Sequence, residues 1–502
     1  MRPSHIAPTV ARSAAVSLLL VATAVASAQQ GAPVIAPQGS SSPAQSSSTL
    51  GATQQLYGAT GSNGAQPTAD TFHGSVVTGK ATDATLDLSL DDAIQRGLRS
   101  NLGVLLQASS VENANGERLS QLQALLPTVT ANVSVEAEQV NLAAFGLKFP
   151  GLNPIIGPFQ VEDFRGYLTQ NVLNLAALQN YLAAKHDFLS AKLTADDARD
   201  MVVLTVGNAY LVCVADAARI EAVKAELATA KVSLDQANAA HDAGTSPRLD
   251  VLRAQVDYQN QQQNLIATTN QLAKDKLALA RTIGLPLDQA FNLTDTAPYA
   301  EFAQLDPQAA LEQALKNRKD LQAAAESVKS AQATRAAARD GQLPVAKVSG
   351  DFGDLGTTFG HSHSTYTVTG EVSVPVLQIA RTRGQEQTAD AQVDSTRARL
   401  ADQIQQVNAD IRSSLLDIQA AARLVEATRS NLELANEALS EAQQRFHAGV
   451  ADNLPVTQAQ AQVQQANDQY IAALYQHNVA KLTLARALGV AQTNYKDYLG
   501  GK

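Results

Sequence analysis

Two segments of the chain show a strict alternation of apolar and polar residues. Residues 128–138, TVTANVSVEAE, place Val or Ala at every second position, with Thr, Asn, Ser or Glu between them. Residues 365–376, TYTVTGEVSVPV, have the same period, with Tyr and Val dominating the apolar side. A period of two residues predicts β-strands that have one apolar and one polar face. The predicted apolar face comprises Val129, Val133, Val135, Tyr366, Val368, Val372 and Val374.

Two further segments, 164–173 and 345–353, alternate less cleanly and bring the predicted strands to four. A tilted strand needs about nine to eleven residues to cross a membrane, and the best-patterned segments are this long. Four strands cannot close a barrel, and an open strand edge in lipid would leave backbone groups unpaired. A membrane location therefore requires several chains to share one barrel. Three chains would supply twelve strands, although the alternation itself does not fix that number. The alternative is a soluble protein in which the strands form hairpins that pack on helices.

Long heptad patterns follow the strands. In the segment 178–243, apolar residues are spaced alternately by three and four at Ile220, Val223, Leu227, Ala230, Leu234 and Ala237. After Gly244 they recur every seven residues at Val251, Tyr258, Leu265, Leu272 and Leu279. This spacing predicts an antiparallel coiled-coil hairpin that turns at Gly244, since glycine tolerates a left-handed backbone. A second hairpin with the same spacing is predicted to turn at Gly449.

The folded part of the sequence occurs twice. KLALARTIG, starting at Lys276, matches KLTLARALG, starting at Lys481, at six of nine positions. Each repeat is predicted to contain a helix, at 90–126 or 307–343, followed by two strands and a helical hairpin. The predicted boundaries are a first repeat at 86–284, a linker at 285–306, a second repeat at 307–490 and a short tail at 491–502.

The N-terminus is typical of an exported protein. Two Arg residues, an apolar run at 14–25 and the sequence Ala26-Ser27-Ala28 predict a signal peptide at 1–28. No Cys follows the cleavage site, which argues against a lipoprotein. Residues 29–85 are rich in Ser, Gly, Gln and Pro and predict a disordered leader. No later stretch reaches eighteen consecutive apolar residues, so we expect no membrane-spanning helix.

The composition narrows the possible chemistry. The chain of 502 residues carries a formal net charge of -9, which argues against nucleic acid as a partner. It lacks the fingerprints of serine hydrolases, P-loop proteins and dinucleotide-binding enzymes. His361-Ser362-His363 has no Cys or acidic cluster beside it, so we interpret it as a polar loop rather than a metal site. We therefore expect no enzyme activity, no cofactor and no metal.

Several short motifs carry a family resemblance. HDAGTSPRLDVLRAQ at 241–255 and RFHAG at 445–449, together with LALARTIG and LTLARALG, resemble the hairpin-tip and helix-ending motifs of the outer membrane efflux protein family, the TolC-type ducts. The resemblance implies a mainly α fold with coiled-coil hairpins that form an α-barrel. It also implies a homotrimer whose chains each give four strands to a shared twelve-stranded β-barrel. It further implies the outer membrane of a diderm bacterium, contact with its lipid, and docking to a periplasmic adaptor (membrane fusion) protein bound to an inner-membrane pump.

The resemblance also implies that the hairpin tips form a gate and an adaptor-docking surface. The tip residues concerned are Gly244, Asp250, Arg253, Gly449 and Asp452. Pro455 stands where the second tip would carry the counterpart of Asp250, which puts an acidic ring at the entrance in doubt. Asp250 could instead form an ordinary surface ion pair with Arg253. Two functions stay open: a passive exit duct for small toxic molecules or secreted polypeptides, and a soluble periplasmic coiled-coil adaptor or scaffold.

Overall fold

The computed structural model describes residues 69–147, 150–151, 153–295, 305–448, 450 and 453–499. The predicted signal peptide and residues 29–68 of the predicted leader lie outside this part. The first half contains β1 (Leu86–Leu88), α1 (Leu90–Ser100), α2 (Leu102–Gln123), β2 (Thr128–Asn141), β3 (Ile155–Leu173), α3 (Leu175–Asp242) and α4 (Arg248–Ile283). The second half contains β4 (Phe291–Leu293), α5 (Pro307–Asn317), α6 (Lys319–Asp340), β5 (Val345–Gly356), β6 (Ser362–Ser373), α7 (Ile379–His447), α8 (Leu454–Ala487) and α9 (Ala491–Leu499). Short 3-10 helices lie at Ala69–His73, Leu142–Phe145 and Phe359–His361.

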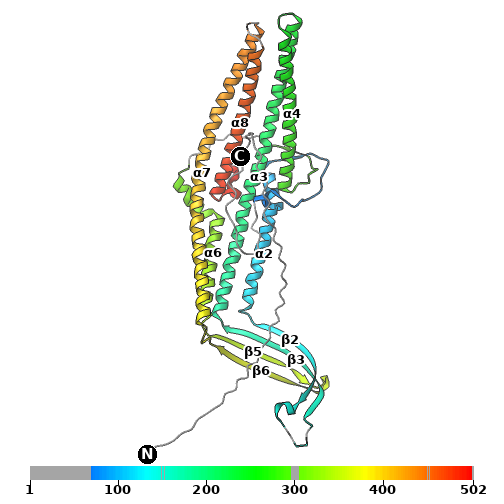
Figure 1. The fold of residues 1–502 in the computed structure, drawn as a ribbon, viewed down its shortest axis with the longest axis vertical. Helices are drawn as coiled ribbons and strands as arrows, with labels where there is room; N and C mark the ends of the chain where they lie inside the picture. The colour runs from blue at the N-terminus through cyan, green and yellow to red at the C-terminus, as the bar shows by residue number, and fades with distance from the viewer. Residues whose placement is uncertain are drawn as a thin grey trace, which may run out of the picture. The chain divides into compact units, whose positions relative to one another are not determined.

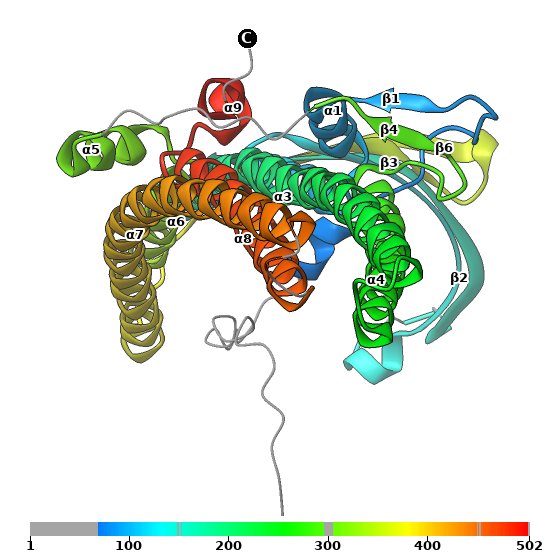
Figure 2. The same ribbon diagram turned by 90° about the horizontal axis from the view of Figure 1, so that it is seen from above.

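The described residues belong to one compact unit, Gly64–Lys502, in which the same element order occurs twice. Each half contains one three-residue strand, β1 or β4, two short helices, two long strands and a long helical hairpin. Within this unit, β2, β3, β5 and β6 lie at one end of the long helices and the turns of the two hairpins at the other (Figure 1). Seen along the helices, α7, α8, α3 and α4 lie side by side in a curved row (Figure 2).

The helices predicted at 90–126 and 307–343 are not continuous, and this part of the prediction is wrong. Asn101 separates α1 from α2 and Arg318 separates α5 from α6, both with an extended backbone. The Asn101 side chain accepts a hydrogen bond from the backbone N–H of Gly103, at 2.9 Å, and so caps α2. The Arg318 guanidinium binds both carboxylate oxygens of Asp320 in the first turn of α6. Local side-chain bonds at equivalent positions therefore break both helices.

The four predicted membrane strands form one antiparallel sheet in the order β2-β3-β5-β6. The pairing of β3 with β5 joins the two halves of the chain, with Tyr167 opposite Asp351. β2 and β6 are therefore the outer strands. β6 ends at Ser373, so Val374, predicted as a strand residue, lies just beyond it. Pro375 has no N–H to donate to a strand ladder, which is consistent with this end.

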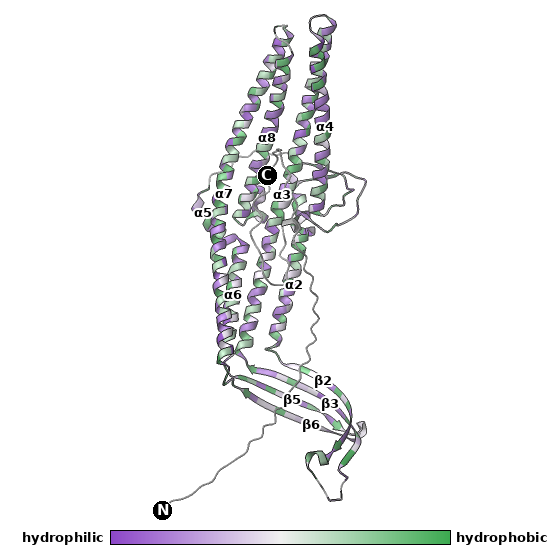
Figure 3. Cartoon of the chain, viewed as in Figure 1, coloured by the Kyte–Doolittle hydropathy of each residue, from purple (hydrophilic) through white to green (hydrophobic). Residues whose placement is uncertain are grey.

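The apolar core lies where the ends of α4 and α8 meet α1, α3 and α9. Val202, Val206, Leu279, Ile283 and Leu484 are fully buried there. α8 approaches α3 closely at Gly207. A Cβ at this position would lie 2.7 Å from Leu482 Cδ1, so the close approach requires glycine. Away from this core, apolar and polar residues are mixed along the long helices (Figure 3).

Helix α3 contains an 18-residue window with a mean hydropathy of 1.7, which could cross a membrane by length and composition alone. Half of that window is buried inside the protein, as in the core helix of a soluble bundle. Among the described residues it is the one helix with this property, and the sequence analysis did not expect it.

The end of the predicted leader is ordered, so the prediction of disorder is wrong for residues from Ala69 onward. The side chain of Phe72 is buried and packs against Gly103 at the start of α2. The backbone N–H groups of Val76 and Thr78 donate to the carbonyl oxygens of Ser100 and Gly284, at 2.9 and 3.0 Å. One aromatic anchor and these backbone bonds hold a segment whose composition alone suggested a disordered chain.

Candidate functional site

One face of the four-stranded sheet is apolar and exposed. Cross-strand neighbours lie on the same face, and Phe352 opposite Tyr366 belongs to the apolar one. Val129, Tyr366 and Val368 are 73%, 76% and 73% exposed. Among the described elements no helix packs extensively against the sheet. An uncovered apolar surface of this kind marks a contact with lipid or with another protein.

The opposite face of the sheet is polar. Its cross-strand pairs include Thr128 with Thr169, Asn132 with Arg165 and Asp351 with Thr367. The Arg165 guanidinium lies between two carboxylates: its Nε donates to Asp163, at 3.2 Å, and its Nη1 donates to Asp351. Its Nη2 donates to Thr365 Oγ1, also at 3.2 Å. The charged group on this face is thus held by three strands and is suited to an aqueous surface.

The first hairpin tip is a tight turn held by its own backbone. Gly244 adopts φ +72°, and its N–H donates to the carbonyl of His241, at 2.8 Å. Ser246 Oγ donates to Asp250 Oδ2, at 2.7 Å, and Arg253 lies 3.6 Å from Oδ1 of the same carboxylate. Asp250 is only 3% exposed and lies in the first turn of α4, where a negative charge is favourable. The Asp250 carboxylate is therefore bound by side chains of the turn and of the first turns of α4.

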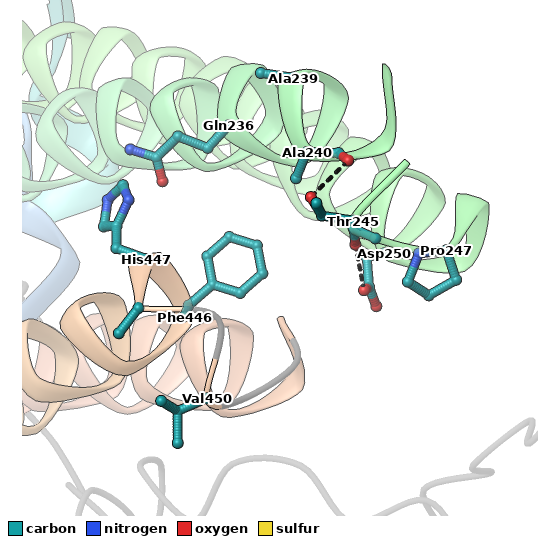
Figure 4. A pocket seen from close by; sticks show the side chains of 11 residues that line it. Gln236, Ala239, Ala240, Thr245, Pro247, Asp250, Phe446, His447 and Val450 are labelled. Atoms are coloured by element: carbon teal, nitrogen blue, oxygen red, sulfur yellow. Dashed lines mark hydrogen bonds between the residues drawn. The ribbon is translucent and has the colours of Figure 1, made fainter. Parts of the chain in front are cut away.

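The second tip contributes Phe446 and His447 at the end of α7. Both side chains lie toward the first hairpin, and Gln236 of α3 faces His447 (Figure 4). A cavity of about 710 Å³, open to solvent, lies between the two tips. Its lining also includes Thr245, Asp250 and Val450. The predicted tip residues Gly449 and Asp452 lie outside the described part of the chain, whereas Pro455 lies in the first turn of α8.

Along the long helices, away from the tips, a charged group links the two hairpins. Arg219 of α3 donates to Asp468 of α8, at 2.9 Å, and to Asp216 of its own helix, at 3.4 Å. Burial, together with a hydrogen bond to Asp275 of α4, raises the pKa of Asp216 to about 7. Sequence reasoning missed this cluster because its members are 56 or more positions apart in the chain, except for Asp216 and Arg219. The spacing of those two residues by one helical turn was the available signal.

The comparison with family models identifies one match. The model described as "Outer membrane efflux protein" matches residues 163–285 and 310–490. These two matches include the second part of β3 with the first long hairpin, and β5, β6 and the long hairpin of the second half.

The chain is also similar to two curated proteins of Pseudomonas putida. It is 26% identical to the pyoverdine export outer membrane protein OpmQ over 319 residues, which cover 62% of this chain and 66% of OpmQ. It is 25% identical to the toluene efflux pump outer membrane protein TtgF over 421 residues, which cover 80% of this chain and 83% of TtgF.

The fold is similar to that of the outer membrane protein VceC from Vibrio cholerae. The TM-score is 0.69 with 18% identity, and the match covers 80% of this chain and 96% of VceC. The predicted fold class, long α-helical hairpins with four β-strands per chain, is confirmed by this likeness and by the element order of the chain.

Proposed function

Because this chain belongs to the outer membrane efflux protein family, we propose that it is the passive exit duct of an efflux or type I secretion system. Both curated relatives are named as outer membrane proteins of export or efflux. The cargo would cross the outer membrane through the protein, and an inner-membrane pump would supply the energy. The family is one of transport components, and no catalytic step is part of the proposal.

The observation that carries the proposal is the two-faced sheet. Its exposed apolar face is suited to lipid, and its polar face, with Arg165 held between two carboxylates, is suited to a water-filled lumen. β2 and β6 each leave one edge unpaired within the described chain. In lipid, the backbone N–H and C=O groups of such edges need hydrogen-bond partners from another strand, so β6 of one copy would pair with β2 of the next. Three copies would close a barrel of twelve strands.

The helical part would continue the lumen into the periplasm. The curved row of α7, α8, α3 and α4 supplies one sector of a wall, which further copies would complete. At the far end, the two tips would form the entrance and would bind a periplasmic adaptor. The cavity between the tips, lined by Thr245, Phe446 and His447, is the surface we propose for that contact.

The sequence features at the N-terminus complete the proposal. Residues 1–28 would direct export and be removed. Two repeats, 86–284 and 307–490, would each supply one strand pair and one hairpin, in line with the duplicated element order. The rival prediction, a soluble periplasmic adaptor, is not supported, since the family is that of outer membrane efflux proteins and helices leave both faces of the described sheet uncovered.

Membrane fractionation combined with gel electrophoresis tests the proposal. The protein should be found in the outer membrane and should migrate, without heating, as an oligomer that dissociates on boiling. The purified oligomer should give discrete conductance steps in a planar bilayer. Recovery of a soluble periplasmic monomer with no conductance would overturn the proposal.

A further inference from the structure

A second cavity lies between the two hairpins, away from their tips. It has a volume of about 140 Å³ and is lined by residues of all four long helices. Glu226 and Thr229 belong to α3, Asp257 and Gln261 to α4, and Asn467 to α8, while α7 supplies Asn436. The lining contains no Lys, Arg or His. Two carboxyl groups therefore face a small polar cavity that has no basic side chain in its wall.

The partners of these carboxyl groups are few. Glu226 Oε1 accepts one hydrogen bond, from Asn467 Nδ2 at 3.3 Å. Glu226 Oε2 is buried and accepts none. Among the described residues, neither Glu226 nor Asp257 takes part in an ion pair; the nearby Arg219 is bound to Asp468 and Asp216. Burial of carboxylates without a compensating charge costs free energy, so the site favours a positively charged occupant.

A second buried oxygen of this cavity lacks a hydrogen-bond partner. Gln261 is 6% exposed, and its Nε2 donates to Gln464 Oε1, at 3.2 Å. Because the amide nitrogen is used in that bond, the oxygen Oε1 is the atom left over, and it is buried without a hydrogen-bond partner in the described chain. A neutral amide oxygen of this kind is an acceptor, and together with two carboxyl groups it makes a set of ligands that consists only of oxygen.

We propose that this cavity binds a hard divalent cation, Mg²⁺ or Ca²⁺, through oxygens of Glu226, Asp257 and Gln261. Such ions prefer carboxylate and amide oxygens and complete their coordination with water. The cavity has room for the ion and a few water molecules. The double positive charge of such an ion balances the two negative charges of the ionised Glu226 and Asp257 carboxylates.

The bound ion would hold the two hairpins together. It would connect α3 to α4 directly, and it would connect both to α8 through the bonds from Glu226 to Asn467 and from Gln261 to Gln464. Sequence patterns do not reveal this site, because Glu226 is 31 positions away from Asp257 in the chain and all three ligands lie at polar positions of ordinary coiled-coil helices. The inference does not depend on the proposed export function.

Metal titration of the purified, metal-stripped, full-length protein in detergent tests the inference. Isothermal titration calorimetry with MgCl₂ and with CaCl₂, at a fixed alkaline pH, should show saturable binding of one ion per chain. The same salts should raise the melting temperature measured by circular dichroism, because a ligand that binds the native state stabilises it. NaCl at matched ionic strength should have neither effect.

Two variants and one control decide the assignment. Glu226→Gln and Asp257→Asn should each weaken cation binding by at least about tenfold and abolish the thermal shift. Glu221→Gln removes an exposed carboxylate of the same helix, one that pairs with Lys224, and should bind the ion like the wild type. Absence of saturable binding to the wild type would overturn the inference. Unchanged binding to both folded variants would do so as well.

Discussion

The Nε of Arg219 on α3 lies 2.9 Å from Oδ1 of Asp468 on α8, and this ion pair joins the two hairpins of one chain. The pair is partly exposed, with 35% and 48% of the two side chains accessible, so solvent screens it. Screened pairs of this kind contribute about 0.2–1 kcal/mol. Its importance lies in its position, because any opening of the entrance that separates the hairpins must break it.

Removal of this pair should favour the open entrance. Asp468→Asn is expected to raise the open probability of channels in planar bilayers by up to about fivefold, the population change that corresponds to about 1 kcal/mol. Glu433→Gln is the matched control, because it breaks the pair of Arg429 with Glu433 within α7 alone. Equal effects of both variants would show that the inter-hairpin pair has no special role.

The two faces of the sheet should respond differently to a charge. Val133→Lys places a cation on the apolar face, where it should cost about 2–4 kcal/mol near the middle of the membrane. Thr130→Lys places the same charge on the polar face of the same strand, opposite Tyr167, and should be tolerated. The yield of heat-modifiable oligomer in the outer membrane measures both. Equal yields would contradict the assignment of the faces.

The buried Asp216 should make stability depend on pH. Burial and the hydrogen bond to Asp275 raise its pKa from 3.8 to about 7, so the folded state holds a proton that the unfolded state releases. The free energy of unfolding should therefore fall as pH rises from about 4 to about 7, and this contribution should level off above that range. In the Asp216→Asn variant, the melting temperature should depend less on pH over this interval. Glu221→Gln, at an exposed position on the same helix, should keep the wild-type profile.

Much of the fold could be predicted from periodicity. The alternation of Val with Thr located β2 and β6, and the heptads predicted the first long helix within a few residues of the bounds of α3. Each pattern directly reflects the repeat of its element, two residues in a strand and seven in a coiled coil. The breaks at Asn101 and Arg318 could not be predicted, since each depends on one side chain that bonds to a nearby backbone or carboxylate group.

The candidate site was predicted in part. The residues of the apolar face of the sheet are exposed as expected, apart from the position of Val374 after β6. The role of Asp250 was left open between gating and local pairing, and its burial beside Ser246 could not be read from the sequence, because it depends on how the turn packs. The Glu226 cavity needs four helices to exist, so its residues look like ordinary polar positions in each helix taken alone.

The ordered end of the leader should matter for stability, whereas the preceding segment should not. Phe72→Ala removes a buried aromatic ring and should destabilise the protein by about 3 kcal/mol, visible as a lower melting temperature. Deletion of residues 29–68 should leave both the melting temperature and export intact. Loss of transport by correctly inserted oligomers that lack residues 29–68 would contradict the second expectation.

The last prediction concerns Asp250, for which a structural and a gating role have different consequences. If its carboxylate serves the turn, Asp250→Ala should lower stability by about 1 kcal/mol, since it removes the acceptor for Ser246 and a favourable charge in the first turn of α4. Single-channel conductance and open probability should then stay at wild-type values, because the carboxylate is 3% exposed and is bound to Ser246 within the turn. Ser246→Ala should reproduce the loss of stability, as it deletes the other partner of the same bond. A large rise in open probability for Asp250→Ala, with no such rise for Ser246→Ala, would instead assign the carboxylate to the gate.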